Sequence, residues 1–372
     1  MRYSRTACLA WLASGGLSPA DLTAVLEEEP DPVRLWEGCV SGGGMDLFPD
    51  SGRLRALLRK NSAEKYMDAW ESLMERDGIR AMTMGDEAYP ERLRPLPDAP
   101  ALLFYQGDPG TLREGRTVSV VGSRSASARG LEATRKMTEA LSEAGVRIIS
   151  GLAYGIDAAA HTGCLKGGSP TVAVLGCGLD QNYPAENEPL RRSILAHGGA
   201  VISEYAPGEK PLGWHFPVRN RIISGLGDCL VLMEARIRSG SMTTVQHALN
   251  QGKDVFVYPG DPESVKYEGN RQLLREGAIY FTSAGDLMED MRWLDKTRVV
   301  GQNSGGEEAE EPDLSPEEKK IWKAVEGEEQ GFDELCARTG LSPAQLNATL
   351  SMLQIQGLVE ALPGKRYRRT AN

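Results

Sequence analysis

Small and hydroxyl-bearing residues gather in a loop that could bind phosphate. The stretch GSRSAS at 122–127 places Arg124 between Ser123 and Ser127, at the expected start of a helix. Backbone amides at a helix start and a guanidinium group together stabilise a bound phosphate. Gly122 has no side chain, so the backbone can approach such a ligand closely. The loop therefore predicts a phosphate-binding site.

Three more loops of similar composition follow apolar runs, namely GLAYGID at 151–157, GCGLD at 176–180 and RSGSMTT at 238–244. Glycine in any one of them is equally explained by a tight turn between a strand and a helix. Four such loops, two of them with an arginine, favour a site for several phosphates in a row. From the second and fourth loops we predict Gly151, Ala153, Gly155, Arg238, Ser239, Gly240, Ser241 and Thr244 as binding residues.

The segment WHFPVRNRIISGL at 214–226 combines aromatic rings with phosphate donors. Aromatic stacking contributes about 1–3 kcal/mol per base to single-strand binding and tolerates any sequence. We predict that Phe216, Arg219, Asn220 and Arg221 belong to the same site. The competing interpretation is that Trp214 and Phe216 pack under the sheet while the arginines form surface ion pairs.

Signals for catalysis are weak. The four histidines stand apart in sequence, and neither HExxH nor GxSxG occurs. Glu234 precedes the RSGS loop and is the best candidate for an acid, whereas His161 is expected to pack or cap. A dinucleotide is disfavoured because the first loop is not GxGxxG and no acid ends the second strand. We predict no catalytic residue, no cofactor and no metal.

These loops need a sheet to position them. From 117 to about 291, short strand-like runs (TVSVV, VRIIS, TVAVL, AVIS, CLVLM, DVFVY, AIYFT) alternate with stretches of helical length. Such alternation predicts the α/β fold class with a doubly wound, mostly parallel, Rossmann-like sheet. Ligands of open α/β sheets bind beyond the carboxyl ends of the strands, where these loops lie.

The rest of the chain divides by composition. Residues 1–75 are expected to form a small helical domain of the SAM or helix-hairpin-helix type, and 76–295 the extended Rossmann-like domain. An acidic linker at 296–314 follows, because this stretch contains most of the acidic run GEEAEEPDLSPEE at 306–318, which is too polar to fold by itself. Residues 315–372 suggest three helices and a hairpin at Pro363-Gly364, an order similar to a winged helix.

Composition limits the partners and the compartment. The net charge is −10, but residues 116–260 hold 15 Lys plus Arg against 12 Asp plus Glu, so a nucleic-acid site must be local. The six cysteines form no CxxC pair, which favours a reduced, cytoplasmic environment. No apolar run is long enough to cross a membrane.

Five motifs in order, VGSRSAS, SGLAYGIDAAAH, AVLGCGLDQNYPAEN, HFPVRNRIISGL and EARIRSGSMTTVQHALNQGKDVFVYPG, resemble the DNA-processing protein A family, also called DprA or Smf. The resemblance covers about 77–290. It implies a dimeric single-stranded DNA binder that protects incoming DNA in natural transformation and loads a RecA-type recombinase. It further implies phosphate binding by Ser123 and Arg124 and base stacking by Phe216.

Two alternatives stay open. The domain is also similar to nucleotide phosphoribohydrolases of the lysine-decarboxylase-like group, although Gln246 stands where their catalytic acid is expected. In the other, the C-terminal module with Lys365, Arg366, Arg368 and Arg369 is the main DNA contact.

Overall fold

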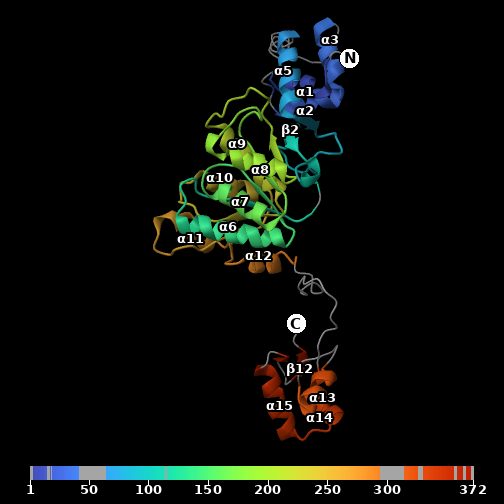
Figure 1. Ribbon diagram of the computed structural model, residues 1–372, viewed down its shortest axis with the longest axis vertical. Coiled ribbons are helices and arrows are strands. Elements are labelled where there is room, and N and C mark those ends of the chain that lie inside the picture. Colours follow the sequence, from blue (N-terminus) through green and yellow to red (C-terminus); the bar gives the residue numbers. More distant parts are fainter. Residues whose placement is uncertain are drawn as a thin grey trace. The chain divides into compact units, whose positions relative to one another are not determined.

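The computed structural model describes residues 3–14, 17, 19–41, 64–113, 115–293, 314–325, 330–355, 358–362 and 366–369. The chain forms two compact units, Met1–Met291 and Arg292–Asn372 (Figure 1). Each is described by itself. The expected linker at 296–314 lies almost wholly outside the described residues.

A nine-stranded sheet organises the first unit, in the order β1-β2-β6-β5-β4-β3-β7-β8-β9. The strands are β1 (Arg80–Thr83), β2 (Leu102–Gly107), β3 (Thr117–Val121), β4 (Arg147–Ser150), β5 (Thr171–Val174), β6 (Ala200–Ser203), β7 (Cys229–Leu232), β8 (Val255–Val257) and β9 (Ile279–Tyr280). Pairing from β6 through to β9 is parallel, whereas β1 and β2 add antiparallel pairs at one edge. All seven predicted strands are present, and the predicted fold class is confirmed.

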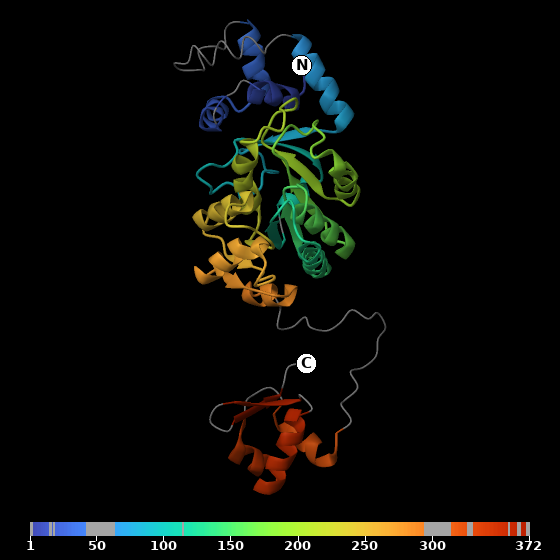
Figure 2. The same ribbon diagram turned by 90° about the vertical axis from the view of Figure 1, so that its left-hand side faces the viewer.

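Helices cover both faces of this sheet (Figure 2). They are α6 (Ala128–Glu143), α7 (Ile156–Gly167), α8 (Glu188–Ala196), α9 (His215–Leu226), α10 (Gly240–Asn250), α11 (Glu268–Arg275) and α12 (Ala284–Asp290), with 3-10 turns at Pro109–Leu112, Ala185–Asn187 and Val265–Tyr267. The central strands are wholly buried because both faces are covered, which explains why they read as continuous apolar runs.

The N-terminal helices are α1 (Arg5–Ser14), α2 (Pro19–Glu28), α3 (Pro32–Ser41) and α5 (Glu64–Asp77). They do not form a separate core. Trp11 and Leu12 of α1 belong to one buried apolar cluster with Phe104 of β2 and Ala173 of β5. The helical module therefore extends the core at the β1-β2 end of the sheet.

The second unit contains α13 (Pro316–Ala324), α14 (Phe332–Thr339), α15 (Pro343–Ile355) and a three-stranded sheet of β10 (Gln330–Gly331), β12 (Arg366–Arg369) and β11 (Val359–Leu362). Strands β11 and β12 form the expected antiparallel hairpin, whose tip at 363–365 lies outside the described residues. The second unit has an apolar cluster of its own, which includes Ile321, Leu346 and Leu353.

Among the helices of the described residues, none has the length and apolar character that spanning a membrane requires.

Candidate nucleic-acid groove

A groove of about 750 Å³ lies beyond the carboxyl ends of the central parallel strands. It receives residues from the loops after β3, β4 and β7 and from the first turns of α9 and α10. Of the predicted residues, those that line it are Gly122, Ser123, Arg124, Ala153, Phe216, Arg219, Asn220, Arg238, Ser239, Gly240, Ser241 and Thr244. Loops far apart in sequence therefore meet in one place, as the strand pattern predicts.

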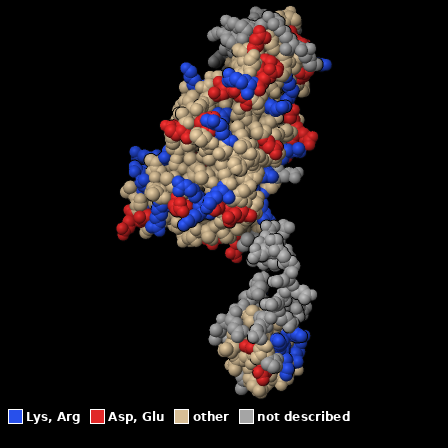
Figure 3. Space-filling view, viewed as in Figure 1, with Lys and Arg blue, Asp and Glu red and all other residues tan. Residues whose placement is uncertain are grey.

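Charge is mixed on the face of this unit that Figure 3 shows. Lys and Arg alternate with Asp and Glu over the visible face, without a continuous basic surface (Figure 3). The groove differs, since four arginines line it, Arg124, Arg219, Arg236 and Arg238, against one acid, Asp157. Its positive character is local, as expected for a chain with net charge −10.

Arg219 is a buried cation at the floor of the groove. Its side chain belongs to a residue only 3% exposed, and Nη1 donates to the carbonyl oxygens of Gly151 (3.1 Å) and Val174. Nε has no hydrogen-bond partner. Burial lowers the pKa of Arg219 to about 10, opposed by nearby Asp157, so the guanidinium still carries its charge at neutral pH. Burial raises the pKa of Asp157, and the Arg219 charge opposes that change.

Phe216 is the aromatic centre of the groove. The Arg124 and Arg219 guanidinium carbons lie 5.0 Å and 5.9 Å from its ring centroid, within the range of a cation–π contact. The Tyr183 ring lies 5.5 Å away at an interplanar angle of 39°. Trp214, just before α9, is 63% exposed, so packing under the sheet is wrong for this residue.

The first turn of α10 also opens on the groove. Ser239 is its N-cap, and the Ser239 and Ser241 hydroxyl oxygens lie 2.7 Å apart. Gly240 has no heavy atom within 4 Å of where a Cβ would stand, so its backbone is accessible. A helix N-terminus with hydroxyls favours an anion.

The first loop corrects part of the prediction. The backbone amide of Ser127 donates to Oε1 and Oε2 of Glu234 at 2.9 Å and 3.1 Å, and its hydroxyl donates to Oε2 at 2.5 Å. The same hydroxyl accepts from the amide of Gly130 at 3.0 Å. The start of α6 is thus occupied by a carboxylate of this chain, and Ser127 lies outside the groove as a helix cap. Glu234 itself is completely buried.

Gly151 and Gly155 also lie outside the groove lining, for reasons of packing. A Cβ at Gly151 would stand 2.8 Å from Nη2 of Arg219, and one at Gly155, where φ is +76°, would stand 2.3 Å from the carbonyl oxygen of Ser123. Both glycines make room for other groove residues. Gly122 does line the groove, yet a Cβ there would lie 2.6 Å from Cγ1 of Ile156, so packing alone already requires a glycine.

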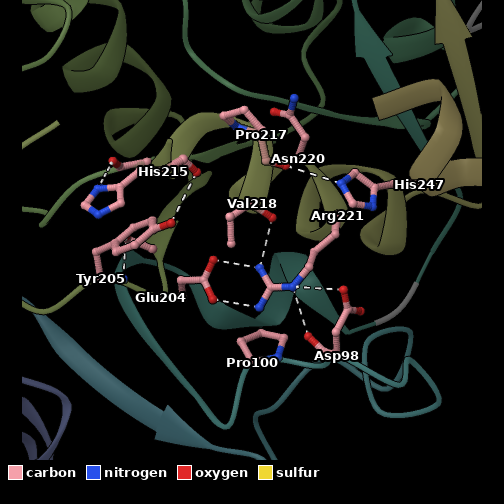
Figure 4. Close-up of polar contacts among 12 residues, drawn as sticks. Asp98, Pro100, Glu204, Tyr205, His215, Pro217, Val218, Asn220, Arg221 and His247 are labelled. Carbon is pink, nitrogen blue, oxygen red and sulfur yellow. Dashed lines mark hydrogen bonds and ion pairs between the residues drawn. The ribbon is translucent and has the colours of Figure 1, made fainter. Parts of the chain in front are cut away.

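Arg221 does not line the groove, and its side chain points toward Glu204 and Asp98 (Figure 4). Nη1 and Nη2 donate to the two carboxylate oxygens of Glu204, each at 2.7 Å, and Nε donates to the carbonyl oxygen of Asp98 at 2.9 Å. The Arg221 side chain is 5% exposed and that of Glu204 12% exposed. Its placement gives no support to the prediction of a phosphate contact, because its donors are already used by a buried ion pair.

Groove residues that sequence reasoning missed include Tyr183, Asp157 and Arg236. Tyr183 belongs to the stretch after GCGLD, and the position of an aromatic residue in a loop that follows a predicted strand was an available signal. The complete lining adds Val121, Ser125, Pro211, Gly213, Pro217 and Ile223.

Residues considered for catalysis have other roles. His161 is buried, its Nδ1 lies 2.8 Å from Oγ1 of Thr171, and burial lowers its pKa to about 3. Gln246 is exposed and donates to Oδ1 of Asn250 at 3.0 Å. Over the described ranges, no three His, Cys, Asp or Glu side chains are grouped as metal ligands.

A Rossmann-like sheet with an arginine-rich, aromatic groove beyond its carboxyl edge defines a phosphate-binding class of α/β protein. The family described as DNA recombination-mediator protein A matches residues 80–292, and the DprA winged helix domain matches 306–365. The chain belongs to this family.

Relatives support the assignment over most of the chain. Protein Smf of Synechocystis is 36% identical over 97% of this chain and 98% of that protein. The DNA processing protein DprA of Streptococcus pneumoniae is 43% identical over 56% of this chain and 73% of that protein. The X-ray structure of Streptococcus pneumoniae DprA covers 77% of this chain and 98% of its own, with a TM-score of 0.65 and 34% identity.

A second solved structure concerns ligand binding. The DNA processing protein A of Helicobacter pylori, whose structure was described for its single-stranded DNA binding mode, covers 57% of this chain and 96% of its own. Its TM-score is 0.52 and its identity is 27%.

Proposed function

We propose that this groove binds single-stranded DNA without catalysis and that the chain delivers the strand to a RecA-type recombinase during transformation or recombination. The observation that carries the proposal is the placement of Arg124 and Arg219 around Phe216 within one groove. Guanidinium groups bind phosphate and the ring stacks on a base, a pairing typical of single-strand binders. The related Helicobacter pylori protein, known for its single-stranded DNA binding mode, supports the same ligand.

Duplex DNA is a poorer ligand for such a site, because its bases are already stacked and paired. Anisotropy with labelled oligo-dT and a matched duplex tests this preference. Three of the groove arginines, Arg124, Arg236 and Arg238, are exposed. If each neutralises one phosphate, log K falls with log salt at a slope of about −2, since single strands give about −0.7 per phosphate. A duplex preference or no salt dependence would contradict the proposal.

Arg124→Ala provides the sharper arm. A phosphate contact carries no base information, so the variant should lose the same factor for oligo-dT and for oligo-dC. Arg92→Ala is unsuitable as a control, because Arg92 pairs with Asp228 at 2.9 Å. Arg275→Ala is better, since Arg275 is exposed at the end of α11 and does not line the groove.

The partners and compartment belong to the same proposal. A homodimer in the cytoplasm that passes its strand to a RecA-type recombinase is consistent with a family of recombination mediators. Sedimentation of the protein alone tests the dimer, and recombinase filament formation on coated DNA tests the loading.

An enzyme of the phosphoribohydrolase type is the second candidate, favoured only by the buried carboxylate of Glu234 near the groove. Both oxygens of that carboxylate accept hydrogen bonds from Ser127. Release of base from nucleoside monophosphates, lost in Glu234→Gln, would support hydrolysis over our proposal.

A further inference from the structure

The guanidinium group of the exposed residue Arg124 lies over the Phe216 ring. Of the two guanidinium groups near the ring, Arg219 belongs to a residue 3% exposed, whereas Arg124 is exposed. Both groups lie within cation–π range of the ring, Arg124 at 5.0 Å from the centroid and Arg219 at 5.9 Å, and of the two only Arg124 belongs to an exposed residue.

Two other neighbours, Gly176 and Tyr183, limit the space around the ring. A Cβ at Gly176 would stand 3.0 Å from Cδ1 of Phe216, so the backbone of that loop packs directly against the ring. Tyr183 lies 5.5 Å away by centroid and is tilted by 39°, which leaves too little space for a base between the two rings. Stacked groups need about 3.5–4.0 Å on each side. A base that stacks on the face of Phe216 covered by Arg124 must therefore displace that guanidinium group.

We propose that Arg124 and a nucleotide base compete for the same face of Phe216, and that a DNA phosphate draws Arg124 off the ring so that the base can stack. The inference rests on the proposed single-strand binding. The competition defines the ligand more narrowly than phosphate binding does. A polyanion without bases draws Arg124 off Phe216 but leaves the ring without a stacking partner. A free base gains the ring but supplies no phosphate to hold Arg124. Only a strand that has both phosphates and bases replaces both contacts, one to Arg124 and one to Phe216.

If Arg124 and a base compete for the ring, removal of the ring should increase the affinity for a strand that has no bases. Phe216→Leu removes the aromatic face but keeps an apolar side chain of similar reach beside Gly176. A strand of abasic residues should bind this variant more tightly than it binds the wild type, since Arg124 no longer has to leave a ring. A cation–π contact at an exposed site corresponds to a gain of about two- to fivefold in affinity. Oligo-dT should bind the same variant more weakly, because the stacked base is lost.

The experiment measures the dissociation constants of oligo-dT and an abasic oligonucleotide of equal length, by anisotropy at one salt concentration. The proteins are the wild type, Phe216→Leu, Arg124→Ala and the double variant, with Phe216→Tyr as the matched control that keeps an aromatic face. Phe216→Tyr should bind the abasic strand like the wild type. In the double variant, Phe216→Leu should give no gain for the abasic strand, because the competing guanidinium is absent.

Equal or weaker abasic binding by Phe216→Leu would overturn the competition, even with oligo-dT binding intact. Failure of the wild type to bind oligo-dT would instead overturn the proposed function, so the two failures are distinguishable. Melting temperatures of all variants show whether the fold is preserved.

Discussion

Replacement of Glu234 by glutamine tests whether this residue is a cap or a catalyst. Its carboxylate accepts the Ser127 amide at both oxygens and the Ser127 hydroxyl at 2.5 Å, in a site with no solvent exposure. An amide offers one acceptor oxygen and turns an NH2 group toward one of these donors. The loss of a charge-assisted hydrogen bond in a buried site costs about 1.5–3 kcal/mol.

That cost converts into a measurable shift. At about 2–4 °C per kcal/mol for a unit of this size, Glu234→Gln should lower the Tm by roughly 3–12 °C. Differential scanning fluorimetry measures it, with Glu263→Gln as the control, because Glu263 is exposed and its replacement removes the same charge. Affinity for oligo-dT should fall less than in Arg124→Ala, since the groove loses a support and not a ligand contact. An unchanged Tm with lost nucleotide hydrolysis would refute this reasoning.

Other predictions concern the groove and its support. Arg221→Met should destabilise the fold by about 3–5 kcal/mol, because Glu204 is left buried without its cation, while oligo-dT affinity of the folded fraction stays unchanged; urea denaturation and anisotropy check both. Gly151→Ala should weaken oligo-dT binding about tenfold by pushing Arg219 aside, whereas Gly85→Ala, outside the groove and with its Cβ no closer than 3.9 Å to Oγ1 of Thr83, should not. Trp214→Phe should abolish most of the tryptophan fluorescence change on DNA binding, since Trp214 is 63% exposed beside the groove residue Gly213. A chain ending at Trp293 should keep most single-strand binding; its loss would favour the C-terminal module as the main DNA contact.

Sequence patterns predicted the sheet well because burial on both faces leaves a clear mark. The runs TVSVV and CLVLM became β3 and β7, adjacent parallel strands whose following loops both reach the groove. The convergence of Arg124, Phe216 and Arg238 followed from strand order alone, since the carboxyl ends of parallel strands share one edge.

Side-chain direction was harder to predict. Arg219 and Arg221 are two apart on one helix, which turns them to different faces. Their shared motif gave no indication that one faces the groove and the other Glu204, because Glu204 lies on a different loop. The role of Gly151 was ambiguous for a similar reason. A glycine is needed where the backbone approaches a phosphate, and it is equally needed where the backbone approaches the Arg219 side chain.

The cap on α6 was not predictable from its own loop. Ser127 has the sequence signature of a phosphate donor, yet its partner Glu234 follows β7, more than a hundred residues later. A carboxylate and a phosphate satisfy the same amides, so the loop sequence does not distinguish them. Only the pairing of β3 with β7 brings the acid to the helix start.

The energetics of Arg219 link the fold to its proposed ligand. A buried cation with an unpartnered Nε and a lowered pKa is costly, because Asp157 compensates only part of its lost hydration. Replacement of a whole buried charge pair by apolar residues is often neutral or stabilising, whereas removal of one partner leaves the other charge unpaired. A DNA phosphate at the groove floor would supply the missing counter-charge. Oligo-dT should therefore raise the Tm of the wild type more than it raises the Tm of a variant that lacks this cation. The double variant Arg219→Met, Asp157→Leu removes both buried charges, so it should keep or raise the Tm of the unliganded protein and reduce the further rise with oligo-dT. If the unliganded Tm instead falls, the charge pair stabilises the fold by itself and the ligand is not needed to explain its burial.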